Sequence, residues 1–244
     1  MKVAVIADIH GNLAALQAVL AALAEDKPDQ IVCLGDVAAT GPQPRESLNL
    51  LQQVGCPTVM GNADAFLLRP EPTASGAGDD VRRIAEIDRW CADRLTEADR
   101  AFVAMFRPTV EIALGSGRRL LCCHGSPRSF DDPIAADTPG DALDRMLDGH
   151  QAALVACGHT HVRLLRHHRE GEIVNPGSVG LAYEFLPDGG VRVPPWAEFA
   201  IVDAPENGPL GIAFRRLPYD QAATVRAMSE RGMPHAAWWA QDWG

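Results

Sequence analysis

Short apolar runs and segments with helical spacing alternate along the first sixty residues, and this alternation limits the fold more than any other feature. The run KVAVIA is followed by a segment in which leucines recur at the spacing of one helix face, at Leu13, Leu16, Leu20 and Leu23. The apolar run QIVCLG, a helical segment RESLNLLQQV and the run PTVMG come next. The order strand, helix, strand, helix, strand predicts a parallel sheet with helices packed against it.

The later chain is dominated by strand patterns. Two helices are predicted after the loop RPEPTASGAGDD, the second beginning at Thr96, which can form a capping box with Asp99. Strands are then predicted at VEIALG, RLLCC, ALVAC, VRLLRHH, EIVNPGS, EFAIVDA and GIAFRRL, before a final helix from about Asp220. Because no repeat or clean linker divides the chain, we expect one domain over residues 1–244, with a helical insertion around residues 65–107.

Composition excludes several classes of function. A formal net charge of −10 argues against an extended nucleic-acid surface, because such binding needs clustered Lys and Arg. The six cysteines show no CxxC spacing, which favours a reducing cytoplasm over a disulfide framework. Asp8 interrupts the first apolar run before a signal-peptide core is complete, and no run approaches the roughly 20 residues that span a bilayer. We therefore expect a cytoplasmic protein without a membrane partner.

Side chains that can bind metals stand where the predicted strands end. Asp8 and His10 follow the first strand, Asp36 the second, Asn62 and Asp64 the third, His124 the run RLLCC, and His159 and His161 the run ALVAC. Strand carboxyl ends form the rim where an open α/β sheet binds ligands. Carboxylate, imidazole and amide donors together suit Mn²⁺, Fe²⁺, Zn²⁺ or Co²⁺ better than Mg²⁺ or Ca²⁺. Four histidines, two aspartates and one asparagine exceed the needs of one tetrahedral ion, whereas two ions sharing a carboxylate would use them all.

Each motif also has a simpler explanation when it is taken singly. GD and GN are common in turns, Asp8 or Asn12 can cap the first helix, and GHTH can form an exposed loop. All the motifs nevertheless occur in one chain, each at the end of a predicted strand. Their joint occurrence favours a shared site.

As a set, the motifs resemble those of the calcineurin-like metallophosphoesterases, in particular the small bacterial and archaeal branch of predicted phosphodiesterases. The shared pattern is Asp-x-His, Gly-Asp, Gly-Asn-x-Asp, His-Gly and Gly-His-x-His, and it extends from Met1 to about Asp203. DIHGN, GPQP, HGSPR, GHTH and NPGSVG match that branch in residues as well as in spacing. The resemblance implies an α/β fold, a four-layer αββα sandwich, and a single metallophosphoesterase domain.

The resemblance also implies how the ligands are divided. Asp8, His10 and His161 would hold one metal, Asn62, His124 and His159 would hold the second, and Asp36 would bridge them. Two divalent ions are expected, with Mn²⁺ first and Fe, Zn, Co or Ni as alternatives. The implied reaction is hydrolysis of phosphodiesters or activated phosphomonoesters by a metal-bridging hydroxide.

One position departs from the wider family. Many members carry a histidine after Gly-Asn that stabilises the transition state or protonates the leaving oxygen, and this chain has Ala63. Asp64 either reaches the site through water or holds a turn, and Asn12 either contacts substrate oxygens or caps the first helix. Asp36, Asp64 and Asn12 are the predicted catalytic residues. The missing histidine predicts a preference for good leaving groups.

The sequence leaves two alternative functions open. One is a phosphatase of phosphoproteins or nucleotide-like metabolites, and the other is a metal-binding interaction scaffold with little catalysis, because a retromer subunit resembles this fold. The expected partner is a small phosphorylated substrate. Arg128 would contact a phosphate or lie in a solvated loop. Tryptophans crowd the carboxyl end, at Trp238, Trp239 and Trp243, and predict docking of that end onto the body, with a homodimer contact as the alternative.

Overall fold

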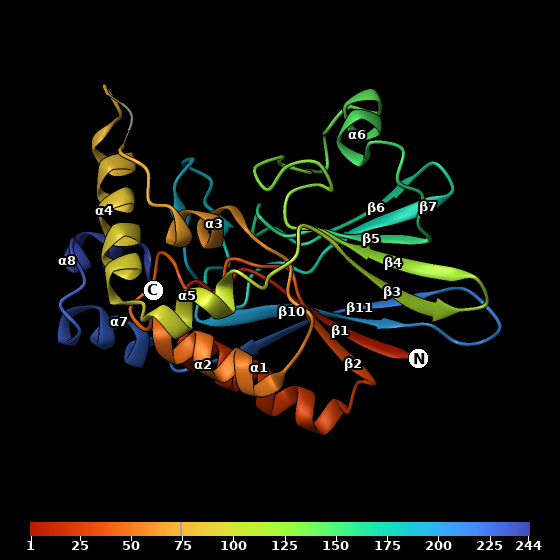
Figure 1. Ribbon diagram of the computed structural model, residues 1–244, viewed down its shortest axis with the longest axis horizontal. Helices are drawn as coiled ribbons and strands as arrows, with labels where there is room; N and C mark the ends of the chain where they lie inside the picture. Colours follow the sequence, from red (N-terminus) through yellow and green to blue (C-terminus); the bar gives the residue numbers. More distant parts are fainter. Residues whose placement is uncertain (74) are drawn as a thin grey trace.

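Strand β1 (Lys2–Ile6) determines how the layers stack, because its alternate side chains enter two different cores. Ala4 and Ile6 pack with Leu16 of helix α1 (Leu13–Asp26), on one face of the strand. Val3 and Val5 face the opposite way and belong to a second core. The computed structural model that shows this arrangement describes residues 1–73 and 75–244 (Figure 1).

Two main sheets face each other across the second core. The first has the order β11-β10-β1-β2, where β2 is Gln30–Cys33, β10 is Trp196–Asp203 and β11 is Gly211–Pro218. The second has the order β3-β4-β5-β7-β6, built from β3 (Val110–Gly115), β4 (Arg118–Cys122), β5 (Leu154–Ala156), β6 (Leu164–His168) and β7 (Gly171–Asn175). Pairs β1/β2, β4/β5 and β5/β7 are parallel, so their carboxyl ends lie at the same edge of each sheet. A small hairpin pairs β8 (Glu184–Phe185) with β9 (Val191–Arg192).

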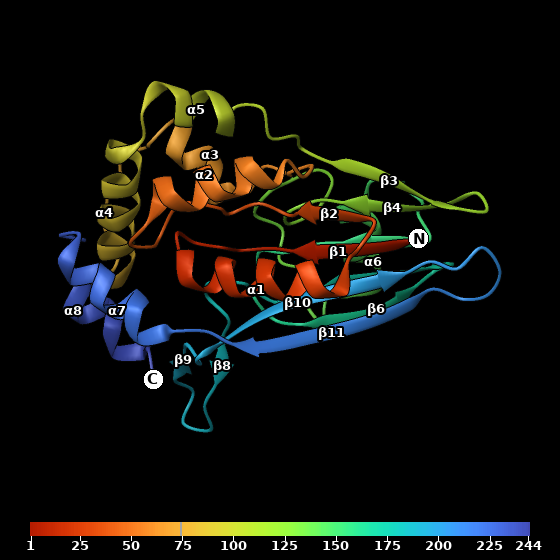
Figure 2. The same ribbon diagram turned by 90° about the horizontal axis from the view of Figure 1, so that it is seen from below.

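The three hydrophobic clusters confirm the predicted four-layer αββα sandwich. Val3 and Val5 pack between the sheets with Leu120 of β4 and Leu154 of β5. The outer face of the second sheet is covered by helix α6 (Gly140–Leu147), whose Leu143 packs with residues of β4, β5 and β7. On the other side α1 covers the first sheet, next to α2 (Pro44–Val54) (Figure 2). The order is therefore helix, sheet, sheet, helix.

The remaining helices gather at one end of the sandwich. They are α3 (Asn62–Leu68), α4 (Asp79–Arg94), α5 (Glu97–Val103), α7 (Gln221–Glu230), α8 (Ala236–Trp239) and the 3₁₀ turn η1 (Ala240–Asp242). The predicted capping box of Thr96 and Asp99 opens α5. Helices α4 and α8 lie side by side in both views (Figures 1 and 2), and the guanidinium of Arg83 stacks 5.0 Å from the ring centroid of Trp238. Trp239 is buried in the core, which confirms that the carboxyl end docks onto the body.

The structure corrects the predicted strand PTVMG. Instead of a full ladder, this segment makes single bridges, from Thr58 to Cys33 and from Val59 to Arg107. Its neighbours change after one residue, and α3 begins at Asn62, so no run of paired residues can form.

The six cysteines are free, and burial raises the pKa of Cys33, Cys122 and Cys157, as expected for small apolar core residues. Among the described residues, no helix combines the length and apolarity needed to cross a membrane.

Candidate metal centre

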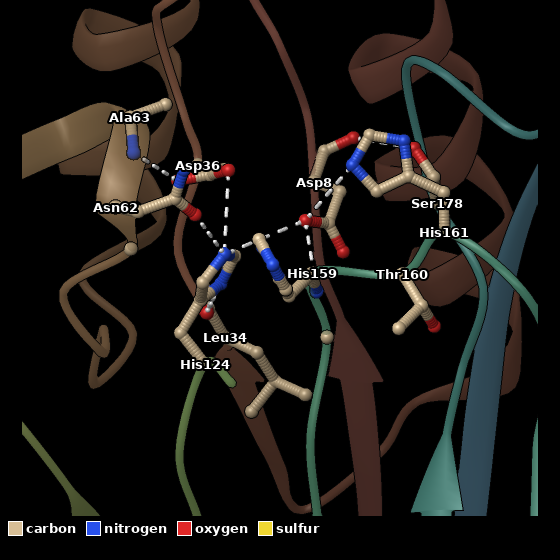
Figure 3. Close-up of polar contacts among 12 residues, drawn as sticks. Asp8, Leu34, Asp36, Asn62, Ala63, His124, His159, Thr160, His161 and Ser178 are labelled. Atoms are coloured by element: carbon tan, nitrogen blue, oxygen red, sulfur yellow. Dashed lines mark hydrogen bonds and ion pairs between the residues drawn. The ribbon is translucent and has the colours of Figure 1, made fainter. Parts of the chain in front are cut away.

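The seven predicted metal ligands converge on the edge where the parallel strands end. Asp8 and His10 follow β1, Asp36 follows β2, Asn62 begins α3, His124 follows β4, and His159 and His161 follow β5. Figure 3 shows side chains from these separate segments directed toward one another. The sheet edge therefore brings together groups that lie up to 153 residues apart in the chain, as between Asp8 and His161.

Three of the histidines are held in one orientation by backbone carbonyls. Nδ1 of His10 lies 3.2 Å from the carbonyl oxygen of Ala39. Nδ1 of His124 lies 2.8 Å from the carbonyl oxygen of Leu34, and Nδ1 of His161 lies 2.8 Å from that of Leu181. A carbonyl only accepts hydrogen bonds, so each Nδ1 carries the proton and donates it. Nε2 is then the atom left to bind a metal, an arrangement typical of metal-ligating histidines.

The first group of donors joins Asp8, His10 and His161. The Nε2 atoms of His10 and His161 are 3.0 Å apart, and Nε2 of His161 is 3.3 Å from Oδ1 of Asp8. All three donor atoms lie within 4.8 Å of one another. This is the same trio that the family resemblance implied for one metal.

The second group joins Asp8, Asp36 and His124. Nε2 of His124 is 3.3 Å from Oδ2 of Asp36, 4.0 Å from Oδ1 of Asp8 and 3.0 Å from Oδ1 of Asn62. Oδ2 of Asp36 is also 3.8 Å from Nε2 of His10, so this carboxylate of the second group faces the first group as well. Asp8 contributes to both groups, which the sequence did not indicate.

His159 lies at the outer side of the second group. Its ring centroid is 5.3 Å from that of His124, and its backbone N–H donates to Oδ1 of Asp8 over 3.3 Å. The side chain is half-buried and lines the cavity above the centre. The structure thus places it beside His124, but outside the two compact groups.

The residues present fit divalent cations. Oδ2 of Asp8 is buried without a hydrogen-bond partner among the described residues, and such an atom is costly unless a positive group meets it. His10 and His161 also direct Nε2 atoms at each other that both lack a proton in the neutral ring. A set of carboxylate, imidazole and amide donors agrees with Mn²⁺, Fe²⁺, Zn²⁺ or Co²⁺.

The pKa shifts within the cluster show that the buried carboxylates stabilise positive charge beside them. Burial alone would lower the pKa of His124, but the charge of Asp36 raises it to about 10, so a proton is held beside the carboxylates. Burial opposes ionisation of Asp36 as well, yet His124 keeps the pKa of this carboxyl well below its usual range. His10 behaves differently, because burial, followed by the charge of His161, lowers its pKa to about 4. The ring of His10 is therefore neutral at pH 7.

Backbone conformation marks the same residues. Five of the predicted ligands adopt left-handed φ angles, which residues with a side chain rarely do: Asp8 (55°), His10 (46°), Asp36 (54°), His159 (67°) and His161 (57°). This conformation costs about 1–2 kcal/mol for an L-residue other than glycine. Such strain clusters at functional sites, where surrounding contacts maintain it.

At two positions around the centre, neighbouring segments lie so close together that only glycine fits. A Cβ on Gly61 would lie 2.0 Å from Oδ1 of Asp36, and one on Gly180 would lie 1.8 Å from the carbonyl oxygen of Ile9. Both distances are far below any real contact of a Cβ. These close approaches give a physical reason for the glycines in GNAD and NPGSVG.

Asp64 and Asn12 bind the backbone in this structure. Oδ2 of Asp64 accepts from the N–H groups of Asp36 (2.7 Å) and Gly61 (3.1 Å), while Oδ1 accepts from the Val37 N–H (2.9 Å). Burial, followed by the charge of Asp36, raises the pKa of Asp64 to about 7. Of the two alternatives for Asp64, these contacts favour the turn-holding one. A direct part in catalysis stays a prediction.

Asn12 likewise takes the capping role that the sequence allowed. Its Oδ1 accepts from the N–H of Ala15 over 3.1 Å and from the hydroxyl of Thr224 over 2.8 Å. Its Nδ2 donates to the carbonyl of Gly180 over 2.9 Å, and the residue is fully buried. Contact with substrate oxygens stays a prediction for this residue too.

The NPGS motif supports the segments that carry the predicted ligands. The hydroxyl of Ser178 donates to the carbonyl of Asp8 over 2.7 Å, and Nδ2 of Asn175 donates to the carbonyl of Gly158 over 2.7 Å. Arg128 instead pairs with Asp132 on an exposed loop, with a 2.8 Å contact. Of the two alternatives for Arg128, this contact favours an exposed loop residue over a phosphate contact.

Sequence reasoning missed Tyr183, whose ring stacks on His161 with centroids 4.8 Å apart. No local motif marks that tyrosine, because only the loop after β7 brings it to the site.

The chain is similar to several known proteins. An uncharacterized protein of Methanocaldococcus jannaschii is 28% identical over 198 residues, which cover 73% of this chain and 76% of the relative. A solved metallophosphoesterase from Sphaerobacter thermophilus is 26% identical with a TM-score of 0.71, covering 97% of this chain and 96% of that one. A hypothetical protein from Pyrococcus horikoshii shares the fold, with a TM-score of 0.79 at 21% identity, over 96% of this chain and 94% of that one.

The sequence model of the calcineurin-like phosphoesterase superfamily domain matches residues 1–193, well over half of the chain. That segment contains both donor groups, the glycines that let them approach and the loop that carries NPGS. The chain belongs to the calcineurin-like phosphoesterase superfamily.

Proposed function

We propose that this protein hydrolyses phosphodiesters or activated phosphomonoesters at a centre of two divalent metal ions, with Mn²⁺ as the first candidate. The observation that supports this most strongly is the meeting of two three-residue donor groups that share Asp8, with Asp36 of the second group also 3.8 Å from Nε2 of His10 in the first. A single cation would use one group and leave the other buried and unbalanced. Two cations would use both groups.

Asp8, His10 and His161 would hold one ion, and Asn62, His124 and His159 the other, with Asp36 shared. When bound, two divalent ions offset the negative charge of phosphate oxygens and lower the pKa of coordinated water. The protein's own contribution is to hold the ligands in position. The backbone carbonyls of Ala39, Leu34 and Leu181 orient the imidazoles, and Asp64 holds the loop that carries Asp36.

Ala63 affects which esters can react. It lines the cavity beside Asn62, and its backbone N–H donates to Oδ1 of Asp36 over 2.9 Å, but its methyl group cannot donate a proton. A leaving group must then depart with little help from this position. Aryl esters and other good leaving groups are therefore the preferred substrates, and alkyl phosphomonoesters are expected to react slowly.

The test is to compare hydrolysis of bis-p-nitrophenyl phosphate and p-nitrophenyl phosphate by the Mn²⁺-loaded protein. Asp36→Asn should lose at least about tenfold in rate on the diester, because the shared carboxylate is removed. The matched control is Asp141→Asn, since Asp141 lies exposed on α6 and pairs only with Arg145 among the described residues. Circular dichroism checks that both variants keep the fold.

Each outcome separates the candidate functions. Diester hydrolysis that is lost in Asp36→Asn and kept in Asp141→Asn supports the phosphodiesterase. Faster turnover of the monoester would favour a phosphatase of nucleotide-like metabolites or phosphoproteins. Absence of turnover on both esters by metal-loaded protein would reject the hydrolase and favour a metal-binding scaffold.

A further inference from the structure

A cavity of about 650 Å³ opens directly onto the candidate metal centre. Its floor includes His10, Asp36, Asn62, His159 and His161. Pockets that enclose a drug-sized molecule measure roughly 300–1,000 Å³, so this space is far larger than one phosphate group requires. The excess volume lies next to the reacting position and is available to an organic group of the substrate.

Apolar side chains from three helices also line the cavity. Phe66 comes from α3, Ile84 from α4 and Trp239 from α8. Helix α3 packs against α4, and α4 lies beside α8 in both views (Figures 1 and 2). Phe66 and Ile84 are only half-buried, so part of each remains open to the cavity. Burial of an apolar group against aromatic and aliphatic surface of this kind is favourable, because it removes apolar area from water.

The charged side chains of the same cavity disfavour a second phosphate. Apart from the predicted ligands, the described lining residues include three carboxylates, Glu71, Asp88 and Asp131, and one cation, Arg69. Asp88 is half-buried and accepts a hydrogen bond from the hydroxyl of Thr40 over 2.7 Å. A phosphate chain extending past the metals would meet net negative charge in a partly desolvated space, which is unfavourable. An uncharged organic group avoids that repulsion.

We propose that this cavity binds an uncharged aromatic or bulky apolar group attached to the single phosphate of a diester substrate, and that Phe66, Ile84 and Trp239 determine this specificity. The inference rests on the proposed phosphodiesterase function and names its substrate class. The three residues act by contact with the group that stays on the phosphate. They take no part in breaking the ester bond.

The test uses diesters that release the same leaving group. Methyl, phenyl and 2-naphthyl p-nitrophenyl phosphate differ only in the group that stays on the phosphate, so the release of p-nitrophenolate reports all three. Mn²⁺-loaded wild-type protein should show kcat/KM about 30-fold higher for the phenyl than for the methyl ester, from burial of the ring. A γ-linked p-nitrophenyl ester of thymidine triphosphate should be at least about tenfold poorer than the thymidine monophosphate ester, because it adds two phosphates.

Variants assign the preference to the cavity wall. Phe66→Ala and Ile84→Ala should each lower the phenyl-to-methyl ratio of kcat/KM at least about threefold, because each removes apolar surface from the cavity. The matched control is Phe102→Ala, because Phe102 is also half-buried but packs against Phe106 and does not line the cavity. This control should keep the wild-type ratio. Two wall variants are used so that a folding defect in one does not decide the result.

A binding measurement separates this inference from the proposed function. Calorimetry should show that phenylphosphonate binds the Mn²⁺-loaded protein more tightly than methylphosphonate, and that Phe66→Ala removes most of the difference. Equal kcat/KM for methyl and phenyl esters would overturn the cavity assignment and leave the phosphodiesterase standing. Tight phenylphosphonate binding without hydrolysis of any ester would overturn the enzyme and keep the cavity. A preference unchanged in both wall variants would also reject the assignment.

Discussion

His10 and His161 direct their Nε2 atoms at each other across 3.0 Å, although they lie 151 residues apart in the chain. Both rings donate Nδ1–H to a backbone carbonyl, so in the neutral rings two lone pairs face each other. Asp8 adds a carboxylate oxygen 3.3 Å from Nε2 of His161. An arrangement of electron-rich atoms at this spacing is stable when a cation lies among them.

Removal of one of these rings should weaken one metal site. His161→Ala is expected to lower Mn²⁺ affinity at one site by at least about tenfold, because a direct ligand is lost. Titration calorimetry on chelator-treated protein measures this change. The control is His167→Ala, since His167 lies exposed on β6. Two unchanged binding events in His161→Ala would remove this ring from the ligand set.

Gly61 should tolerate no side chain. Gly61→Ala places a Cβ 2.0 Å from Oδ1 and 2.6 Å from the backbone nitrogen of Asp36, so the carboxylate must move. Overpacking of this kind costs about 1–3 kcal/mol, which lowers Tm by roughly 2–12 °C in a chain of this size. Thermal unfolding of the metal-free protein tests the loss. Gly140→Ala is the control, because nothing lies within 4 Å of a Cβ there; equal Tm values in the two variants would contradict the prediction.

Asp64 is expected to act through the position of Asp36. In Asp64→Asn an amide NH₂ replaces one of two oxygens that together accept three backbone hydrogen bonds, so the loop after β2 loosens. The apparent affinity for Mn²⁺ should fall about tenfold, and the rate at saturating Mn²⁺ should return to near the wild-type value. Rates measured across a Mn²⁺ titration distinguish the two alternatives for this residue. A rate that stays low at saturation would mean that Asp64 takes a direct part in hydrolysis.

Asp88 should make stability depend on pH. Burial raises its pKa from 3.8 to about 6, so between these pH values the folded protein keeps a proton that the unfolded chain has released. Stability from this group is therefore present below pH 3.8, falls as the pH rises to about 6, and stays low above that.

The variant Asp88→Asn removes this titration and can still accept the hydrogen bond from Thr40. Its stability relative to wild type should rise by about 1–3 kcal/mol between pH 4 and pH 7. Urea unfolding of both metal-free proteins at unit steps of pH measures the difference. A stability difference between the variant and wild type that stays constant over this pH range would show that folding does not raise the pKa of Asp88.

Much of the secondary structure could be predicted because its signals are local. The leucine spacing of α1, the Asn12 and Thr96 caps and the alternation in β3 each depend on residues within one or two turns of chain. The strand predicted at PTVMG failed for the opposite reason. Whether an extended segment becomes a strand depends on how many partners lie beside it, and Thr58 and Val59 have one bridge each.

The sequence by itself determined which chemistry is available: the ligand residues, their order at strand ends and the missing histidine at Ala63. The tertiary structure decided how those residues are used. It placed His10 against His161, made Asp8 common to both donor groups, directed Asp64 to the backbone and built the cavity wall from α3, α4 and α8. These relationships join segments separated by tens to hundreds of residues, and they depend on how whole layers pack. Sequence periodicity reports which face of an element is apolar, but the packing of complete layers sets which polar groups meet at their edge.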